Sequence, residues 1–321
     1  MKEFGFELRL CAHLEQRTDS IIARQLGGGI TESGRVLDVV LIDQGPSFEQ
    51  RASLTDRAIP TAVLEADIGP GRFKDWRREL GQGIGARRAI EHAIDIGYLE
   101  FDNTAGRERV RSVDRYPVDW FERIIAIENK PDLDEPGDLY EQLQFDISLG
   151  LVDEVVLTTA SHVTRAHLNR LPDVVGIWRF NPGGDEIEII RTATPLPVES
   201  PGMETINRLP GRTELENIDA ETKAAARIRL AERAYGKGWR TFTFPACANL
   251  NPASGPVEGM PYCEHFDRVV NPAAECGPNC PDHRSGPPPA VNLDAIRDRQ
   301  SPWQAAPPRR QSRQMYLGDG W

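Results

Sequence analysis

The stretch that decides the fold places four apolar residues directly before a carboxylate and an amine: Ile124-Ile125-Ala126-Ile127-Glu128-Asn129-Lys130-Pro131. A short, unbroken apolar run is typical of a central strand that is covered on both faces. Alternate side chains of a strand point to the same side, so Glu128 and Lys130 would emerge together where Pro131 ends the ladder. The stretch therefore predicts a buried strand with a functional site at its end. The alternative is an exposed structural ion pair.

The first residues of the chain predict a helix that carries a second unusual carboxylate. Residues 4–17 have a helical period, and Leu10, Cys11 and Leu14 belong to one apolar stripe. Glu7 lies three residues before Leu10 and four before Cys11, which places its carboxylate on the buried side of the helix. An unpaired charge there is costly. The alternative is that Glu7 is an acid in a fraying first turn, stabilised by the helix dipole.

Two strands are predicted next, and the second contains a third unusual carboxylate. Residues 20–26 and 35–43 are apolar runs separated by three glycines, which indicate a turn. The second run is apolar on both sides apart from Asp38. A buried aspartate needs a partner, and that partner is usually a metal ion or a cationic side chain. Asp38 is therefore a candidate site residue together with Glu128.

Composition bounds the class of protein. The 321 residues carry a net charge of −11, and only five of the 38 basic residues are lysine. High acidity with arginine far above lysine is typical of proteins from salt-adapted cytoplasms, and it argues against long-range steering toward nucleic acid. At molar salt, however, only close contacts count. No apolar run approaches the ~20 residues of a membrane span, and the N-terminus lacks a signal peptide, so we expect a cytoplasmic protein without a membrane partner.

Residues 44–120 interrupt the pattern of buried strands and predict an inserted domain. Helical segments near 56–67, 72–80 and 85–97 precede two short strands at 98–101 and 108–113. This order matches a winged helix, whose third helix would be offered to a DNA groove. The alternative is a helical insertion without that function.

The rest of the chain predicts a return to the sheet and then a separate C-terminal part. A helix from 136 to 150 carries Gln142 and Asp146 on one face, and it is followed by a strand at 154–159 and a hairpin of 174–180 with 186–191. Residues 193–218 are rich in Pro, Gly and Glu, which indicates a linker. A basic helix at 219–236 opens a cysteine-rich segment that ends at 285. Residues 286–321 are predicted to be disordered.

The order helix, strand, strand with Asp38, strand with Glu128 and Lys130, helix, strand resembles the PD-(D/E)XK nuclease superfamily. The resemblance rests on residues 1–43 and 121–160 and implies a restriction-endonuclease-like α/β core, which we expect to extend over 121–192. It implies that Asp38 and Glu128 bind Mg²⁺ or Mn²⁺, that Lys130 directs the attacking water and that Glu7 supports the site. Gln142 resembles the glutamine of exonuclease-like members. The sequence departs from the motif at Leu37, at Asn129 and in the 89 residues that separate Asp38 from Glu128.

The cysteines predict a second metal site near the C-terminus. Four of the five lie within 34 residues, among Pro, Gly and Asn: Cys247, Cys263, Cys276 and Cys280. In an intracellular protein such a cluster favours a metal over disulfides. Four thiolates bind Zn²⁺ or an iron–sulfur cluster, and zinc is the better match because Cys11 lies in the core stripe of the first helix. The alternative is that these cysteines bind nothing.

Three classes of function are compatible with these patterns. The leading one is a metal-dependent nuclease that hydrolyses phosphodiester bonds, with DNA as the expected substrate. The second is a DNA-binding regulator that uses a winged helix and a zinc knuckle on a nuclease-like scaffold without turnover. The third is a structural interaction module. The sequence leaves DNA against RNA, cleavage at ends against interior positions, and the oligomeric state open.

Overall fold

The computed structural model describes residues 2–30, 35–134 and 137–303, and these form two compact units. Residues up to Glu49 and Pro117–Trp303 make the larger unit, and Gln50–Tyr116 make the smaller one. The predicted insertion, 44–120, extends several residues beyond the smaller unit at both ends. Phe48 and Trp120 belong to the larger unit, where their rings lie 6.3 and 5.7 Å from the ring of Tyr235.

A six-stranded mixed sheet is the centre of the larger unit. Its strands are antiparallel except where β6 pairs with β7 and β7 with β8, and both of those pairs are parallel. The predicted strands are confirmed within one or two residues. In sheet order they are β1 (Ile21–Gly27), β2 (Val36–Gln44), β6 (Phe121–Asn129), β7 (Glu154–Thr159), β8 (Gly176–Asn181) and β9 (Glu186–Arg191).

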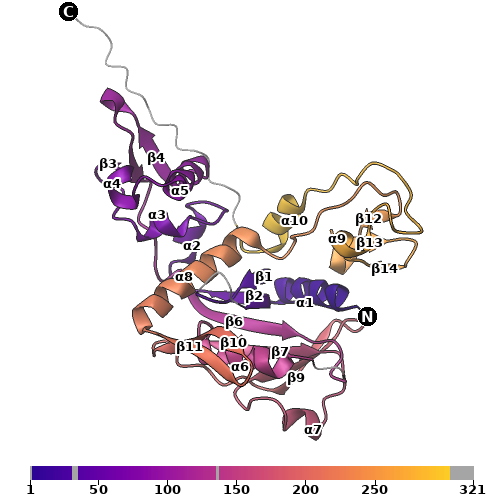
Figure 1. Ribbon diagram of the computed structural model, residues 1–321. Coiled ribbons are helices and arrows are strands. Elements are labelled where there is room, and N and C mark those ends of the chain that lie inside the picture. The colour runs from indigo at the N-terminus through magenta and orange to yellow at the C-terminus, as the bar shows by residue number, and fades with distance from the viewer. Residues whose placement is uncertain (1, 31–34, 135–136, 304–321) are drawn as a thin grey trace, which may run out of the picture. The chain divides into compact units, whose positions relative to one another are not determined.

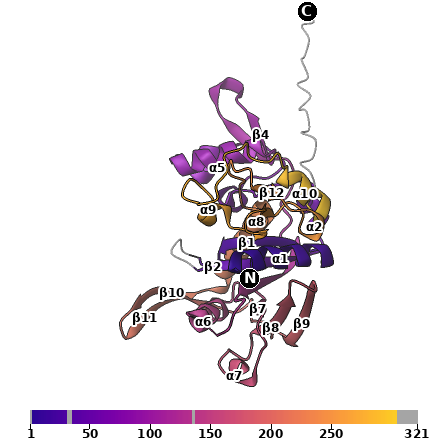
Figure 2. The same cartoon turned by 90° about the vertical axis from the view of Figure 1, so that its right-hand side faces the viewer.

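Two helices cover opposite faces of this sheet. On one face α1 (Glu3–Arg17) packs Phe6 and Leu10 against Val39 and Ile127. On the other, α6 (Leu139–Leu149) connects β6 to the parallel strand β7. In Figure 1 and Figure 2, β7 lies between α1 and α6. The helical stripe of α1 and the unbroken apolar runs of β2 and β6 are thus explained by burial on both faces.

A hairpin occupies most of the segment that was predicted to be a linker. Strands β10 (Gly202–Leu209) and β11 (Arg212–Ile218) pair antiparallel, with an irregularity between Thr205 and Asn207. The prediction of a linker over 193–218 is therefore wrong for these residues. Almost all of β11 is exposed on both faces, so the sequence lacks the alternation by which a half-buried strand is recognised.

The C-terminal part is more ordered than predicted. Helix α8 (Ala220–Lys237) confirms the predicted basic helix, and α10 (Leu293–Gln300) follows the cysteine-rich segment. Trp303 is only 3% exposed, and its Nε1 donates a hydrogen bond to the backbone oxygen of Tyr235 at 2.6 Å. The prediction of disorder from residue 286 is thus wrong for 293–303, and residues 304–321 lie outside the described residues.

The remaining elements of the larger unit are short. They are α7 (Arg165–Leu168), β12 (Leu250–Pro252), η2 (Gly255–Val257), β13 (Pro261–Cys263), β14 (Arg268–Val269) and α9 (Pro272–Glu275). Strands β12, β13 and β14 form a small antiparallel sheet that carries the cysteine-rich segment.

The smaller unit has its own core and its own sheet. Trp76, Ile90 and Val110 are buried within one hydrophobic cluster, and the three strands pair in the order β3-β5-β4. The three predicted helices and two strands are present, although the first two helices are shorter than expected and β3 was not foreseen. The elements are α3 (Thr61–Glu65), β3 (Lys74–Asp75), α4 (Trp76–Leu80), α5 (Ile84–Asp95), β4 (Leu99–Asp102), η1 (Thr104–Gly106) and β5 (Arg109–Ser112), after α2 (Phe48–Ala52), which crosses the boundary between the units.

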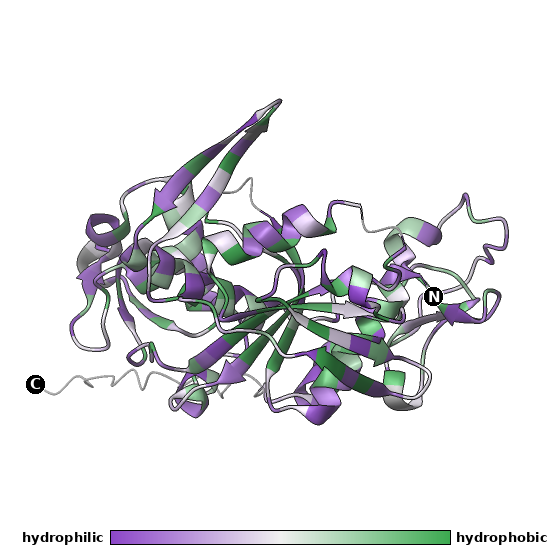
Figure 3. Cartoon of the chain, turned by 90° about the horizontal axis from the view of Figure 1, so that it is seen from below, coloured by the Kyte–Doolittle hydropathy of each residue, from purple (hydrophilic) through white to green (hydrophobic). Residues whose placement is uncertain are grey.

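Hydrophobic residues are concentrated inside the units. Figure 3 shows the central strands of the large sheet mostly in the colours of apolar residues. Among the described residues, no helix has the length and apolar character needed to span a membrane.

Candidate functional site

Asp38 and Glu128 meet at one end of the large sheet. Asp38 lies near the start of β2 and Glu128 near the end of β6, and the antiparallel register pairs their neighbours Val39 and Ile127. The two carboxyl groups lie close enough for the charge of Asp38 to raise the pKa of Glu128, and Oδ2 of Asp38 accepts a hydrogen bond from the backbone N–H of Asn129 at 2.9 Å. The structure therefore brings the two predicted metal ligands together.

Glu7 joins this pair from helix α1. It is 3% exposed, and its carboxylate accepts hydrogen bonds from Nε of Arg24 and from Nε2 of Gln25, the latter at 3.2 Å to Oε2. The same Nε2 lies 3.4 Å from Oδ1 of Asp38, so Gln25 connects the two acids. The alternative of a fraying first-turn acid is excluded by this burial.

Lys130 lies at the same end of the sheet, just past β6. It is half-buried, its backbone N–H donates to the oxygen of Thr158 at 2.9 Å, and its charge acts on the carboxyl group of Glu3 together with that of Asp38. In the described part of the chain, the Lys130 ammonium forms no ion pair with Glu128, so the alternative of a structural pair between them is not what the structure shows.

Gln142 is not in the cluster, but its neighbour one turn later is. Among the described residues, the Gln142 side chain makes no hydrogen bond with the acids, and its backbone N–H donates to the oxygen of Asp138 within α6. Asp146, four residues further along the same helix face, is 6% exposed and faces the site. Gln142 and Asp146 thus share one face of α6, and of these two only Asp146 contacts Arg35 in the structure.

Arg35 is the functional candidate that the sequence did not reveal. It lies one residue before β2, and its Nη2 donates to Oε2 of Glu128. Its Nε lies 3.4 Å from Oδ1 of Asp146 and its Nη2 lies 3.5 Å from Oδ2. No local pattern marks an arginine beside a glycine-rich turn as buried, because its partners come from β6 and α6.

Burial raises the pKa values of the acids in this cluster. The pKa of Glu128 rises to about 8, first because of desolvation and then because of the charge of Asp38, although Arg35 opposes both. Desolvation likewise raises the pKa of Asp146 to about 7, against the effect of Arg35. The pKa of Asp38 is also raised by burial, and the N–H of Asn129 opposes the rise. Burial is therefore the main reason why these acids hold their protons more tightly than usual.

A count of formal charges gives the net charge of the cluster when its acids are ionised. Glu7 is paired with Arg24, and Glu3 has Lys130 nearby. Among the described residues, the three remaining carboxylates, those of Asp38, Glu128 and Asp146, share one guanidinium, that of Arg35. When all three acids are ionised, the charge is −3 + 1 = −2. One divalent cation would neutralise the cluster.

No group of three or more His, Cys, Asp and Glu side chains within the described ranges is arranged to hold a metal ion. In the acidic cluster the position between Glu128 and Asp146 is filled by the Arg35 guanidinium. The carboxyl groups of Asp38 and Glu128 remain next to each other there. Carboxylate oxygens suit Mg²⁺ and Mn²⁺, which bind through one or two carboxylates and keep several waters.

The four predicted zinc cysteines lie in one small part of the larger unit. Cys247 and Cys263 are buried in one apolar cluster with Leu250, and Cys276 packs against it. Burial, and then the charges of the three other thiols, raise the pKa of Cys276 to about 11. All five cysteines of the chain are free thiols. The thiols are therefore neighbours, and a metal between them stays a prediction.

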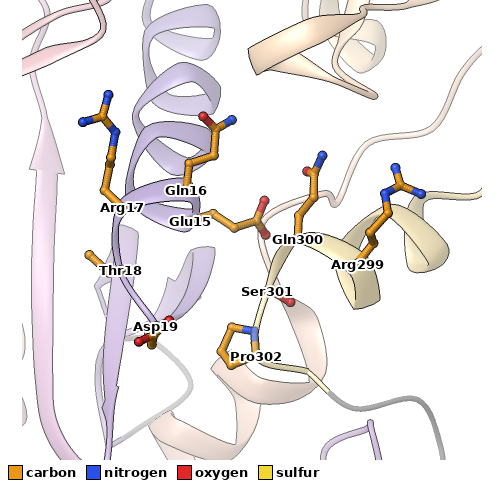
Figure 4. Close-up of a pocket in the computed structure, with 9 residues that line it drawn as sticks. All are labelled: Glu15, Gln16, Arg17, Thr18, Asp19, Arg299, Gln300, Ser301 and Pro302. Atoms are coloured by element: carbon orange, nitrogen blue, oxygen red, sulfur yellow. The ribbon is translucent and has the colours of Figure 1, made fainter.

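A separate polar pocket of about 380 Å³ lies between the end of α1 and α10 (Figure 4). Glu15 is in its wall, and its carboxylate accepts hydrogen bonds from Arg240 and from Nε1 of Trp239, the latter at 3.0 Å. The Glu15 carboxylate is thus already bound by two neighbouring side chains.

Comparison with known proteins gives a family and no named relative. The model of a family described as a family of unknown function (DUF5787) matches residues 21–285. The matched residues include Asp38, Glu128, Lys130 and the four clustered cysteines, and they begin after Glu7. Searches of the curated proteins and of the solved structures found no match.

Proposed function

The chain belongs to the DUF5787 family, and we propose that it is a metal-dependent nuclease of the PD-(D/E)XK type. The observation that carries the proposal is the acidic cluster at the end of β2 and β6, where Asp38 and Glu128 lie next to each other, burial raises the pKa of both, and Lys130 lies at the same end of the sheet. Buried carboxylates without a cation are costly, and functional sites are where such costs are tolerated.

The topology supports the same assignment. Helix α1 is followed by the antiparallel strands β1, β2 and β6, then by α6 and the parallel strand β7. This is the element order implied by the resemblance, and the carboxylates lie on the strands where that resemblance puts its ligands. The smaller unit is inserted between the second and third strands of this order.

The residues present fit a single hard divalent cation. Asp38 and Glu128 would hold Mg²⁺ or Mn²⁺, which would stabilise negative charge on the phosphodiester and lower the pKa of a bound water. The charge count supports one such ion, since two more charges make the cluster of Asp38, Glu128, Asp146 and Arg35 neutral.

The other residues of the site position and move protons. Gln25 links Glu7 to Asp38, and the N–H of Asn129 fixes the second oxygen of Asp38, so that carboxylate has a set orientation. Lys130 extends from the strand end without an ion-pair partner among the described residues, and its ammonium is available to orient the attacking water. We assign no catalytic step to Gln142, which lies on α6 one turn before Asp146.

We propose DNA as the substrate because of the smaller unit. Residues 50–116 hold 12 Lys and Arg and 11 Asp and Glu, a net charge of +1, so the other residues carry −11 − 1 = −12. Its helices α3, α4 and α5 and its β3-β5-β4 sheet follow the order of a winged helix. The exposed side of α5 presents Arg87 and Arg88, which are suited to phosphates.

The competing function is a DNA-binding regulator without turnover, and the winged-helix order of the smaller unit is what favours it. This function requires only the smaller unit and does not explain why the larger unit has a cluster of buried acids. It predicts DNA binding that survives Asp38→Asn and no cleavage by the parent protein with any divalent ion.

The direct test is cleavage of linear and circular DNA at high salt, with Mg²⁺ or Mn²⁺ and with chelator. We expect cleavage only with metal, and a loss of about a thousandfold in Asp38→Asn and Glu128→Gln because both remove a ligand. Asp43→Asn is the matched control, since Asp43 lies on the same strand and pairs with Ser20 and Arg123. A parent protein that does not cleave with either ion, or equal activity in Asp38→Asn, would refute the nuclease.

We also propose that Cys247, Cys263, Cys276 and Cys280 bind one structural metal ion, with Zn²⁺ ahead of an iron–sulfur cluster. The supporting observation is that the four thiols gather in one place, where Cys247, Cys263 and Cys280 all act on the pKa of Cys276. They are free thiols, and four neighbouring thiolates are a ligand set that suits Zn²⁺.

Elemental analysis of freshly purified protein tests this second site. We expect about one zinc per chain in the parent and in Cys11→Ala, which removes a buried thiol outside the cluster, and little metal in Cys276→Ser. Iron with visible absorbance would identify the cluster instead. The absence of both metals from the parent protein would contradict the site.

A further inference from the structure

Arg35 is held by three segments at the centre of the acidic cluster. It lies one residue before β2. Its Nη2 donates a hydrogen bond to Glu128 on β6, and its Nε lies near the carboxylate of Asp146 on α6. Its side chain is only 12% exposed, and those of its two acidic partners are 8% and 3% exposed. The guanidinium thus occupies the position between two acids that a bound cation would favour.

The contacts of Arg35 are uneven, and one donor is unused. The bond to Glu128 is close, whereas the nitrogen–oxygen distances to Asp146 are 3.4 and 3.5 Å, longer than a good hydrogen bond. Nη1 donates to the backbone oxygen of Val36. In the part of the chain that the structure describes, Nε is buried and makes no hydrogen bond, although Oδ1 of Asp146 lies 3.4 Å from it. A buried N–H without a hydrogen bond is unusual and suggests that a further acceptor arrives.

We propose that Arg35 is a phosphate-binding residue, held on Glu128 and Asp146 in the metal-free protein and released toward the nucleic acid when a divalent ion takes Glu128. This inference rests on the proposed nuclease function and adds to it the group that binds the substrate. After the metal ion has bound Glu128, Asp146 still attracts the guanidinium of Arg35 and keeps it near the site. A planar guanidinium with several N–H donors is well matched to a phosphate.

The proposal predicts opposite shifts from one substitution. Arg35 competes with the metal for Glu128 and repels it, so its loss should strengthen metal binding. It also binds phosphate, so its loss should weaken nucleic acid binding at the site. A purely structural counter-ion would weaken metal binding when removed, because the carboxylates would lose their orientation, and it would leave DNA binding unchanged.

The experiment compares Arg35→Gln and Arg35→Lys with the parent by calorimetry with Mn²⁺ and by anisotropy with duplex DNA in Ca²⁺, which is used to limit turnover. For Arg35→Gln we expect Mn²⁺ binding about threefold to tenfold tighter, from the lost repulsion. We expect DNA binding about tenfold weaker, from the lost phosphate contact. Arg35→Lys keeps the charge and should hold Mn²⁺ like the parent, with DNA binding between the other two. Arg123→Gln, which removes an arginine paired with Asp43 and Glu154 on the same sheet, should match the parent.

The outcomes separate this inference from the function it rests on. If Arg35→Gln binds Mn²⁺ no more tightly than the parent, or binds DNA equally well, the proposed role of Arg35 is wrong. The proposed nuclease function still stands in that case, provided that the parent binds Mn²⁺ and cleaves DNA. A parent that binds no Mn²⁺ overturns both. If Arg35→Gln does not fold, Arg35→Lys decides, because parent-like DNA binding in that variant contradicts the need for a guanidinium.

Discussion

Lys130→Ala is expected to lower the rate of DNA cleavage by about a hundredfold to ten-thousandfold, the usual contribution of a positioned acid–base group. Divalent-metal binding should be nearly unchanged, because Asp38 and Glu128 hold the ion in our proposal. Lys130→Arg should also fail, although it keeps the charge. A guanidinium is planar, spreads its charge and keeps its proton, so it replaces a compact ammonium poorly in a half-buried position.

Single-turnover kinetics and calorimetry with Mn²⁺ on the same preparations measure the two effects. Lys2→Ala is the control, since Lys2 is an exposed lysine whose ammonium pairs with Glu275. A structural role for Lys130 predicts a different pattern, with Lys130→Arg almost silent and Lys130→Ala costing at most ~1 kcal/mol of folding free energy. An arginine variant that cleaves as well as the parent would remove Lys130 from the mechanism.

Metal binding is expected to become about 10-fold to 100-fold tighter between pH 6 and pH 8. Burial raises the pKa of Glu128 to about 8 and that of Asp146 to about 7, so both acids hold protons at the lower pH. A carboxylate must be deprotonated to bind the ion, and each proton released steepens the dependence by up to about tenfold per pH unit. Calorimetry with Mn²⁺ in buffers of different ionisation enthalpy measures both the affinity and the protons released.

The same acids give the metal-free protein a stability that falls with pH. The folded pKa of Glu128 lies above its ordinary value of 4.5, so the unfolded state loses its proton first, and the free energy of unfolding decreases from about pH 4.5 to pH 8. Glu128→Gln should therefore stabilise the metal-free protein at pH 8 by about 1–3 kcal/mol and have little effect at pH 5. Denaturant unfolding with chelator tests this. A parent whose stability is the same at pH 5 and pH 8 would contradict the raised pKa values.

The sequence predicted the parts of the fold whose side chains follow a simple period. The runs of β2 and β6 are buried on both faces, and α1 has one buried stripe, so each could be recognised alone. The hairpin of β10 and β11 was missed because most of its side chains face solvent on both sides. Trp303 was missed because a single tryptophan in a proline-rich tail gives no sign that Tyr235 will cover it.

The residues of the candidate site also fall into two groups, those that a local sequence pattern identifies and those that it does not. Asp38 and Glu128 could be identified because a carboxylate within an apolar strand is anomalous in the sequence itself, and Glu7 because it falls on a buried stripe. Arg35, Gln25 and Arg24 could not, since long polar side chains beside a turn are ordinary, and their burial depends on elements far away in the chain. Asp146 was noted on its helix face, but only Arg35 shows that this face meets the site.

The two ends of the smaller unit leave the large sheet side by side. The N–H of Gly45 donates to the oxygen of Trp120 at 2.8 Å, and β2 and β6 remain paired up to Gln44 and Phe121. An excursion that begins and ends at one hydrogen-bonded pair leaves the register of its host unaltered, and chain entropy grows only slowly with its length. The insert could therefore be replaced by another at two adjacent backbone positions without disturbing the large sheet, and in our proposal this would change the DNA-binding part of the protein while leaving the acidic cluster as it is.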